Sequence, residues 1–189
     1  MRRGRFVGTV FESIQSATGN PLVDEAMILI AVYLILIIPV SLIAIWLLGH
    51  KRASFVIFTV TVVAIIAAQG LGQLYAHPPP HLQGYETLLE NDPGNAFPSN
   101  HASAIFGFAF GVVYLRWHRL GIMALALAIL LGFARVYTGL HFPLDIVGGI
   151  AAAVIGVGIV AFARPYVDRL GDLAISIESR LWSIVPLGR

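Results

Sequence analysis

Two polar segments, FPSNH at positions 97–101 and RVYTGLHFPLD at positions 135–145, decide how this chain is organised. The sequence between them is almost entirely apolar, apart from the basic turn RWHR at positions 116–119. Apolar runs of about 20 residues indicate membrane-spanning helices, so two crossings joined by this turn would return both segments to one membrane face. A cation, two histidines, a hydroxyl and a carboxylate would then meet at one interface. This combination of groups is suited to phosphoryl chemistry on a lipid-borne substrate.

The composition indicates a membrane protein. Of 189 residues, 58% are hydrophobic and only 12% are charged, against about 25% charged residues in an average chain. The length allows one helical bundle, and the absence of cysteine excludes disulfides and cysteine-bound metals. We therefore predict an all-α fold, a polytopic transmembrane bundle of five to six helices with amphipathic helices at both ends. The membrane domain covers residues 1–165, and residues 166–189 form an amphipathic C-terminal tail.

The apolar pattern predicts five crossings, at about 24–48, 54–75, 101–115, 121–136 and 143–163. Residues 6–18 have helical apolar spacing and predict a short interfacial helix. Pro39 is expected to kink the first crossing. Gly107 and Gly111 are expected to let helices approach closely. A loop as long as 76–100 tends to be functional.

The loops predict the orientation of the bundle. Five basic residues fall on one side, namely Lys51, Arg52, Arg116, Arg119 and Arg164. The loops 76–100 and 139–143 contain no Lys or Arg, so the positive-inside rule puts both polar segments on the outer face. The arginines at positions 2, 3 and 5 favour the opposite orientation. Five crossings would put the N-terminus on the outer face, whereas the positive-inside rule would keep these arginines on the inner face.

Three residues of the second segment favour catalysis. An arginine near the end of a membrane helix is costly unless it reaches the headgroups, but Arg135 is also close in sequence to His141 and Asp145. Asp145 follows His141 by four residues. A carboxylate one turn away can accept a hydrogen bond from one ring nitrogen, which fixes the tautomer and leaves the other nitrogen as a nucleophile.

The first segment predicts an anion site at a helix start. Ser99 is a good N-cap for the crossing that follows it, which is a purely structural role. The free backbone amides at a helix start also suit phosphate oxygens. His101 is then placed to protonate a leaving oxygen as a general acid.

Together these residues resemble the signature of the type-2 phosphatidic acid phosphatases, membrane lipid phosphatases related to acid phosphatases and vanadium haloperoxidases. The signature has three parts: Lys-x6-Arg-Pro, Pro-Ser-Gly-His and Ser-Arg-x5-His-x3-Asp. The second part is found at 98–101 with Asn100 in place of Gly. The third is found at 134–145 with Ala134 in place of Ser.

The resemblance implies a role for each matching residue. His141 would be the nucleophile that forms a phosphohistidine, Asp145 would orient it, and His101 would be the acid for the leaving group. Arg135, Ser99 and the Asn100 amide would hold the phosphate. No metal and no other cofactor is implied.

The first part of the signature is missing. The proline pair Pro79-Pro80 aligns with Arg-Pro, which leaves proline in place of the arginine, and the only lysine, Lys51, lies on the opposite face. Polar residues near this position are possible substitutes for the missing cations, namely Gln69, Gln73, His77 and His81.

The predicted function is hydrolysis of a lipid phosphate or diphosphate at the outer face. The small size resembles the bacterial undecaprenyl-diphosphate phosphatases of the superfamily, and phosphatidic acid and phosphatidylglycerol phosphate are alternative substrates. A second hypothesis is a weakened relative that binds or transports lipid phosphates. The expected partners are the lipid phosphate and the bilayer, with no nucleic acid, and a homo-oligomer would add a second copy of the chain.

A metal site is a third hypothesis. Its ligands would come from His77, His81, Glu86, Glu90 and His101. The three prolines at 78–80 prevent a helix there and with it a regular ligand face, which counts against this hypothesis.

Overall fold

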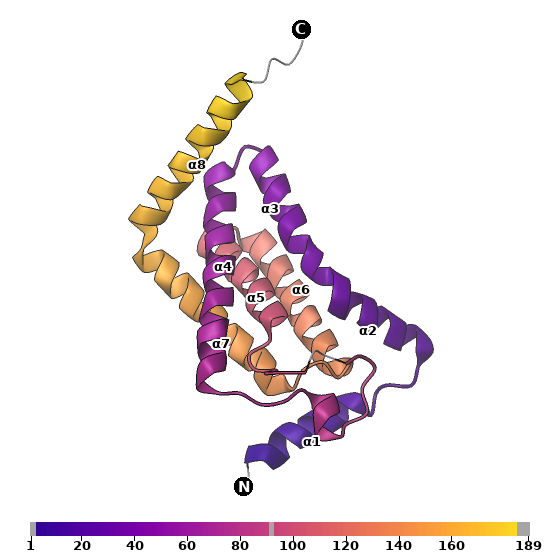
Figure 1. The fold of residues 1–189 in the computed structure, drawn as a ribbon. Coiled ribbons are helices and arrows are strands. Elements are labelled where there is room, and N and C mark those ends of the chain that lie inside the picture. Colours follow the sequence, from indigo (N-terminus) through magenta and orange to yellow (C-terminus); the bar gives the residue numbers. More distant parts are fainter. Residues whose placement is uncertain (1–2, 91–92, 185–189) are drawn as a thin grey trace.

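The computed structural model describes residues 3–90 and 93–184, so the outer limits predicted for the two parts, residues 1 and 189, lie outside the described range. All regular elements in this part of the chain are helices (Figure 1), which confirms the predicted fold class. In chain order these are α1 (Arg3–Gln15), α2 (Pro21–Tyr33), η1 (Leu34–Leu36), α3 (Ile37–Leu47), α4 (Lys51–Leu74), η2 (Pro80–Gln83), α5 (Asn100–Tyr114), α6 (His118–Tyr137), α7 (Pro143–Phe162) and α8 (Arg164–Ile184).

Four helical stretches within the described residues are long and apolar enough to cross a membrane. They are Pro21–Leu47, Lys51–Leu74, His118–Tyr137 and Pro143–Phe162. The expected crossing at 101–115 is α5, whose 15 residues span about 22 Å, less than the ~30 Å hydrocarbon core. It is largely buried and packs against α4, α6 and α7. The predicted number of five to six spanning helices was therefore imprecise, because α5 is a short helix in the centre of the bundle.

The first crossing is interrupted, as Pro39 predicted. The helix tightens into the 3-10 turn η1 at Leu34–Leu36 and resumes as α3. Proline has no N–H group and its ring clashes with the carbonyl group four residues earlier, here that of Ile35, so the disturbance lies just before Pro39.

Small residues bring the central helices close together. A Cβ atom on Gly107 of α5 would lie 2.9 Å from Cβ of Ala64 in α4, and one on Gly149 of α7 would lie 2.7 Å from Cβ of Ala102 in α5. Gly111 also approaches α4 closely, so the predicted role of Gly107 and Gly111 is confirmed. The starts of α5 and α7 are thereby held next to each other.

The N-terminal helix lies across the end of the bundle where α6 ends and α7 begins (Figure 1). The side-chain amide of Gln15 donates to the carbonyl oxygens of Val136 and Tyr137, both at 2.9 Å. Phe11 is fully buried, with its ring centroid 5.0 Å from that of Phe142. A helix of 13 residues is about 20 Å long, too short to cross, so α1 covers this end.

The C-terminal helix α8 packs against α4 through buried Val167 and through Gly171, and two ion pairs join the same helices. Arg52 forms an ion pair with Asp172 at 2.7 Å, and Lys51 forms one with Glu178. The apolar side chains of Leu170 and Leu173 are exposed. The predicted amphipathic helix is thus present, with Asp172 and Glu178 paired to the start of α4 and Arg169 exposed.

Candidate active site

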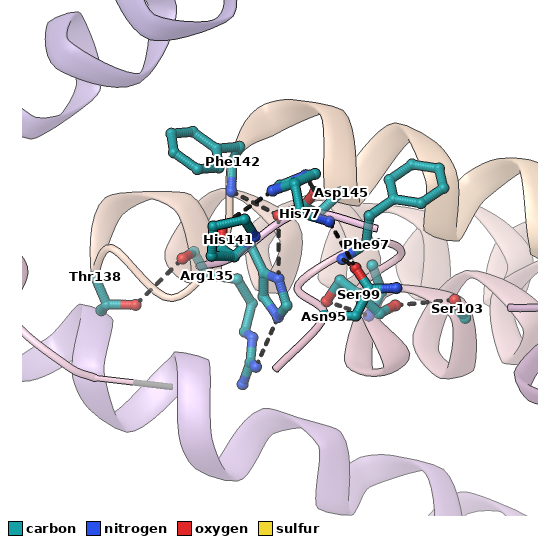
Figure 2. A network of polar contacts seen from close by, with 12 residues as sticks. His77, Asn95, Phe97, Ser99, Ser103, Arg135, Thr138, His141, Phe142 and Asp145 are labelled. Carbon is teal, nitrogen blue, oxygen red and sulfur yellow. Dashed lines mark hydrogen bonds and ion pairs between the residues drawn. The ribbon is translucent and has the colours of Figure 1, made fainter. Parts of the chain in front are cut away.

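The second polar segment builds a chain of three side chains (Figure 2). Nη2 of Arg135 lies 3.0 Å from Nε2 of His141, and Nδ1 of His141 lies 3.4 Å from Oδ2 of Asp145. A guanidinium can only donate, so Nε2 of His141 must accept, and the ring proton is on Nδ1, directed at the carboxylate. The three residues predicted to act together are therefore adjacent, with the lone pair of His141 on Nε2.

The turn between α6 and α7 places His141. The backbone amides of Leu140 and His141 both donate hydrogen bonds to the carbonyl oxygen of Arg135, at 3.0 and 3.2 Å. Gly139 has φ +80°, a left-handed conformation that glycine adopts without steric cost. Pro143 then occupies the first turn of α7, where its missing N–H group leaves no bond unmade.

Asp145 is fully buried and is held from several directions. Its Oδ2 accepts a hydrogen bond from the backbone amide of Phe142 at 2.9 Å, and its Oδ1 lies 2.8 Å from Nε2 of His77. Its own backbone oxygen accepts from the amide of Ser99 at 3.1 Å. Asp145 therefore joins the long loop, the turn before α7 and the start of α5.

The contact between His77 and Asp145 was not foreseen. The sequence suggested His77 as a substitute phosphate ligand, but its Nε2 is directed at Asp145 and its Nδ1 lies 3.0 Å from the carbonyl oxygen of Pro78. Asn95 and Ala96 fix the backbone of His77 through hydrogen bonds of 3.1 and 2.9 Å. The residues of this loop lie far from Asp145 in sequence and follow no regular spacing, so the contact between His77 and Asp145 could not be predicted from the sequence.

The surroundings shift the pKa values of His77 and His141 in opposite directions. The hydrogen bond to Asp145 raises the pKa of His77 by more than its partial burial lowers it. Burial lowers the pKa of His141, the charge of Arg135 acts in the same direction, and the hydrogen bond to Asp145 opposes both. His141 is accordingly held neutral, with its Nε2 lone pair available.

The start of α5 lies beside Asp145. Ser99 is completely buried and its Oγ accepts from the amide of Ala102 at 3.4 Å, so it caps the helix as expected. The side chain of Asn100 accepts from Nε2 of Gln69 at 3.0 Å, which turns it toward α4. His101 is half-buried, and its burial, together with the charges of Arg135 and His141, lowers its pKa to about 4, so without a bound anion its imidazole is neutral.

Arg135 has donor capacity left over. Its Nη1 donates to the carbonyl oxygen of Ala31 in α2 at 3.3 Å, whereas its buried Nε has no hydrogen-bond partner. The side chain is only 6% exposed. A buried guanidinium with an unused N–H group is suited to bind an anion.

The remaining candidates lie apart from this cluster. Gln73 is exposed at the end of α4, and His81 lies in η2 with a buried Nδ1 that has no partner. Pro79, which occupies the position aligned with the missing arginine, is fully buried. Among the described residues, no group of three or more His, Asp or Glu side chains is placed to hold a metal ion, so the alternative site at His77, His81, Glu86, Glu90 and His101 is not assembled.

Comparisons with known proteins place this chain among similar sequences and folds. The family model described as the PAP2 superfamily matches residues 52–170. The putative undecaprenyl-diphosphatase YbjG of Escherichia coli (strain K12) is 33% identical over 143 residues, which cover 72% of this chain and 71% of that protein. Undecaprenyl-diphosphatase BcrC of Bacillus subtilis (strain 168) is 28% identical over 182 residues, covering 91% and 93%. The crystal structure of Aquifex aeolicus LpxE shares the fold, with a TM-score of 0.67 at 24% identity over 79% of this chain and 93% of that one.

Proposed function

The chain belongs to the PAP2 superfamily, and from this membership we propose that it removes a phosphate from a lipid phosphate or diphosphate at the outer membrane face. Undecaprenyl diphosphate, or another polyprenyl diphosphate, is the substrate we expect, because two similar proteins carry the name undecaprenyl-diphosphatase. The outer face is supported by the loops 76–100 and 139–143, which contain no Lys or Arg.

The chain of contacts from Arg135 through His141 to Asp145 carries the proposal. Binding alone requires a cation but no imidazole with a fixed tautomer. Here the Nδ1 proton of His141 is directed at Asp145, and its Nε2 lone pair faces the only strongly basic group of the cluster. That geometry prepares Nε2 to attack a phosphorus atom bound next to Arg135.

The proposed reaction has two steps. In the first, Nε2 of His141 forms a bond to the terminal phosphorus while the bond from phosphorus to the bridging oxygen breaks. His101, which takes up a proton when the negative charge of the bound phosphate lies beside it, donates that proton to the leaving oxygen. In the second, His101 takes a proton from water as the water oxygen displaces His141 and releases inorganic phosphate. Asp145 stabilises the positive charge that develops on His141 in the first step.

Phosphate binding relies on few groups. The guanidinium of Arg135 would exchange its contact with His141 for phosphate oxygens and use its free Nε. The first backbone amides of α5 have no acceptors within the helix and supply further donors. We propose that these groups compensate in part for the missing first motif.

The decisive experiment measures phosphate release by the detergent-purified chain in excess chelator. The substrate panel contains a polyprenyl diphosphate, phosphatidic acid and phosphatidylglycerol phosphate, with His141→Ala as the inactive control. We expect release from the polyprenyl diphosphate, its loss in His141→Ala, and an acid-labile phosphohistidine in the wild type during turnover.

Each other outcome has a clear meaning. A preference for phosphatidic acid or phosphatidylglycerol phosphate would replace the proposed substrate but keep the reaction. Dependence on an added metal would overturn the metal-independent mechanism. Folded protein that releases no phosphate from any of these lipids would favour a role in binding or transport.

A further inference from the structure

His77 meets an acceptor at each of its ring nitrogens. Nε2 lies 2.8 Å from a carboxylate oxygen of Asp145 and Nδ1 lies 3.0 Å from the carbonyl oxygen of Pro78. Neither oxygen carries a proton to donate when Asp145 is ionised, so both contacts are hydrogen bonds only if both nitrogens are protonated. The observed geometry therefore fits the imidazolium form of His77.

Asp145 is shared between two histidines and is closer to His77. The distance to Nε2 of His77 is 2.8 Å, against 3.4 Å to Nδ1 of His141. Oδ1 faces His77, whereas Oδ2 faces both His141 and the amide of Phe142. The bond to His77 thus fixes one oxygen, and the carboxylate plane then directs the other oxygen at His141.

His77 itself is held rigidly. Asn95 binds its amide and Ala96 binds its carbonyl oxygen. The rings of Tyr75 and Phe142 lie against the imidazole, with centroid distances of 5.5 and 5.6 Å. The loop therefore presents the imidazole to Asp145 in one orientation (Figure 2).

We propose that His77 is a positioning residue of this phosphatase, and that its imidazolium holds the Asp145 carboxylate in register with His141. This inference rests on the proposed function. It assigns a purpose to a residue two positions before Pro79, the position where the resemblance expects an arginine. The positive charge of His77 binds the orienting carboxylate in preference to the substrate.

The proposal predicts a pH dependence with a definite sign. The ionisable groups that face His77 are Asp145 from α7, His141 across that carboxylate, and Tyr75 from the end of α4. The hydrogen bond to Asp145 raises the pKa of His77, so its proton is retained to a higher pH than in a free histidine. Turnover should be maintained below that raised pKa and should fall as the pH rises through it.

The first test compares kcat and KM across pH 6 to 10 for wild type, His77→Gln and His77→Phe. Glutamine offers an uncharged N–H group near the position of Nε2, so we expect it to retain much of kcat and to lose the alkaline decline. Phenylalanine fits among the neighbouring rings but donates nothing, so we expect kcat to fall about ten-fold or more with little change in KM. The matched control is His118→Gln, an exposed histidine at the far end of α6.

A second test does not depend on activity. Nitrogen-15 NMR of the histidine rings in the full detergent-solubilised chain reports protonation directly, with His77→Gln used for assignment. We expect His77 to be protonated at both nitrogens at pH 7, and its pKa to fall in Asp145→Asn.

The two tests separate the two proposals. A His77 ring with one bare nitrogen at pH 7, or wild-type kcat and pH profile in His77→Phe, would overturn the positioning role. A doubly protonated His77 in a chain that releases no phosphate from any lipid would overturn the proposed function, while the pairing would stand.

Discussion

Nη2 of Arg135 lies 3.0 Å from Nε2 of His141, so the guanidinium occupies the space next to the ring nitrogen that we propose as the nucleophile. The second terminal nitrogen of this guanidinium, Nη1, donates to the carbonyl oxygen of Ala31 in α2, a helix distant in sequence. The same side chain therefore connects α2 to His141, the residue that we propose as the nucleophile.

Arg135→Lys should reduce kcat/KM by about ten-fold or more while the protein still folds. Lysine keeps the charge, but its compact ammonium group cannot reach the carbonyl oxygen of Ala31 and a phosphate at the same time, as the wider guanidinium can. Each charge-assisted hydrogen bond that is lost contributes ~1.5–3 kcal/mol. Steady-state kinetics on the preferred lipid would measure this loss. Arg119→Lys, an exposed arginine at the start of α6, serves as the control. Equal kinetics in both variants would show that Arg135 does not bind phosphate.

Asp145→Asn should lower kcat by about 100-fold or more. The new amide nitrogen replaces either the oxygen that accepts from His77 or the oxygen that accepts from His141 and Phe142, and it can only donate. Asp145 is fully buried, so the opposed N–H groups should also cost ~1–3 kcal/mol of folding free energy. Phosphohistidine trapping and thermal unfolding would measure the two effects. An unchanged kcat would contradict the orienting role.

Gly139→Ala should destabilise the turn that carries His141. An alanine at φ +80° costs about 1–2 kcal/mol, and its Cβ atom would overlap Cγ2 of Thr87. We expect a lower midpoint of thermal unfolding and a lower kcat. Adding Thr87→Gly should remove the two closest contacts, but the backbone Cα at that position stays 3.0 Å away and the backbone strain remains, so only part of the stability should return. Gly70→Ala, where a Cβ atom meets nothing within 4 Å, should be neutral or stabilising.

The orientation can be tested with introduced cysteines, because the chain contains none. Glu86 lies exposed in the long loop and Arg119 lies exposed at the opposite end of the bundle. A membrane-impermeant maleimide should label Glu86→Cys in intact spheroplasts and should label Arg119→Cys only after lysis. The reverse pattern would place the site on the inner face.

Much of this site followed from local spacing. The interval of four residues between His141 and Asp145 across a helix start was enough to predict their contact. Ser99 could be recognised as a helix cap because the signal for capping is local. The close approach of α5 and α4 followed from the two glycines of α5.

Contacts between distant segments could not be predicted in the same way. The bonds from Arg135 to Ala31 and from His77 to Asp145 depend on how α2 and the long loop pack against the bundle. The sequence aligned Pro79 with the missing arginine, but it could not show that this residue is fully buried. A guanidinium introduced there would have to be accommodated inside the loop. Packing of this kind has no periodic signature in one sequence.

The start of α5 gives the site a further property. The N-terminal amides of a helix carry the equivalent of about half an elementary positive charge, and α5 begins beside Ser99 and Asp145. This field belongs to the backbone, so it does not titrate and no exchange of side chains removes it. A chain that lacks two basic residues of its family signature thus keeps a constant attraction for anions at every pH at which the helix is folded.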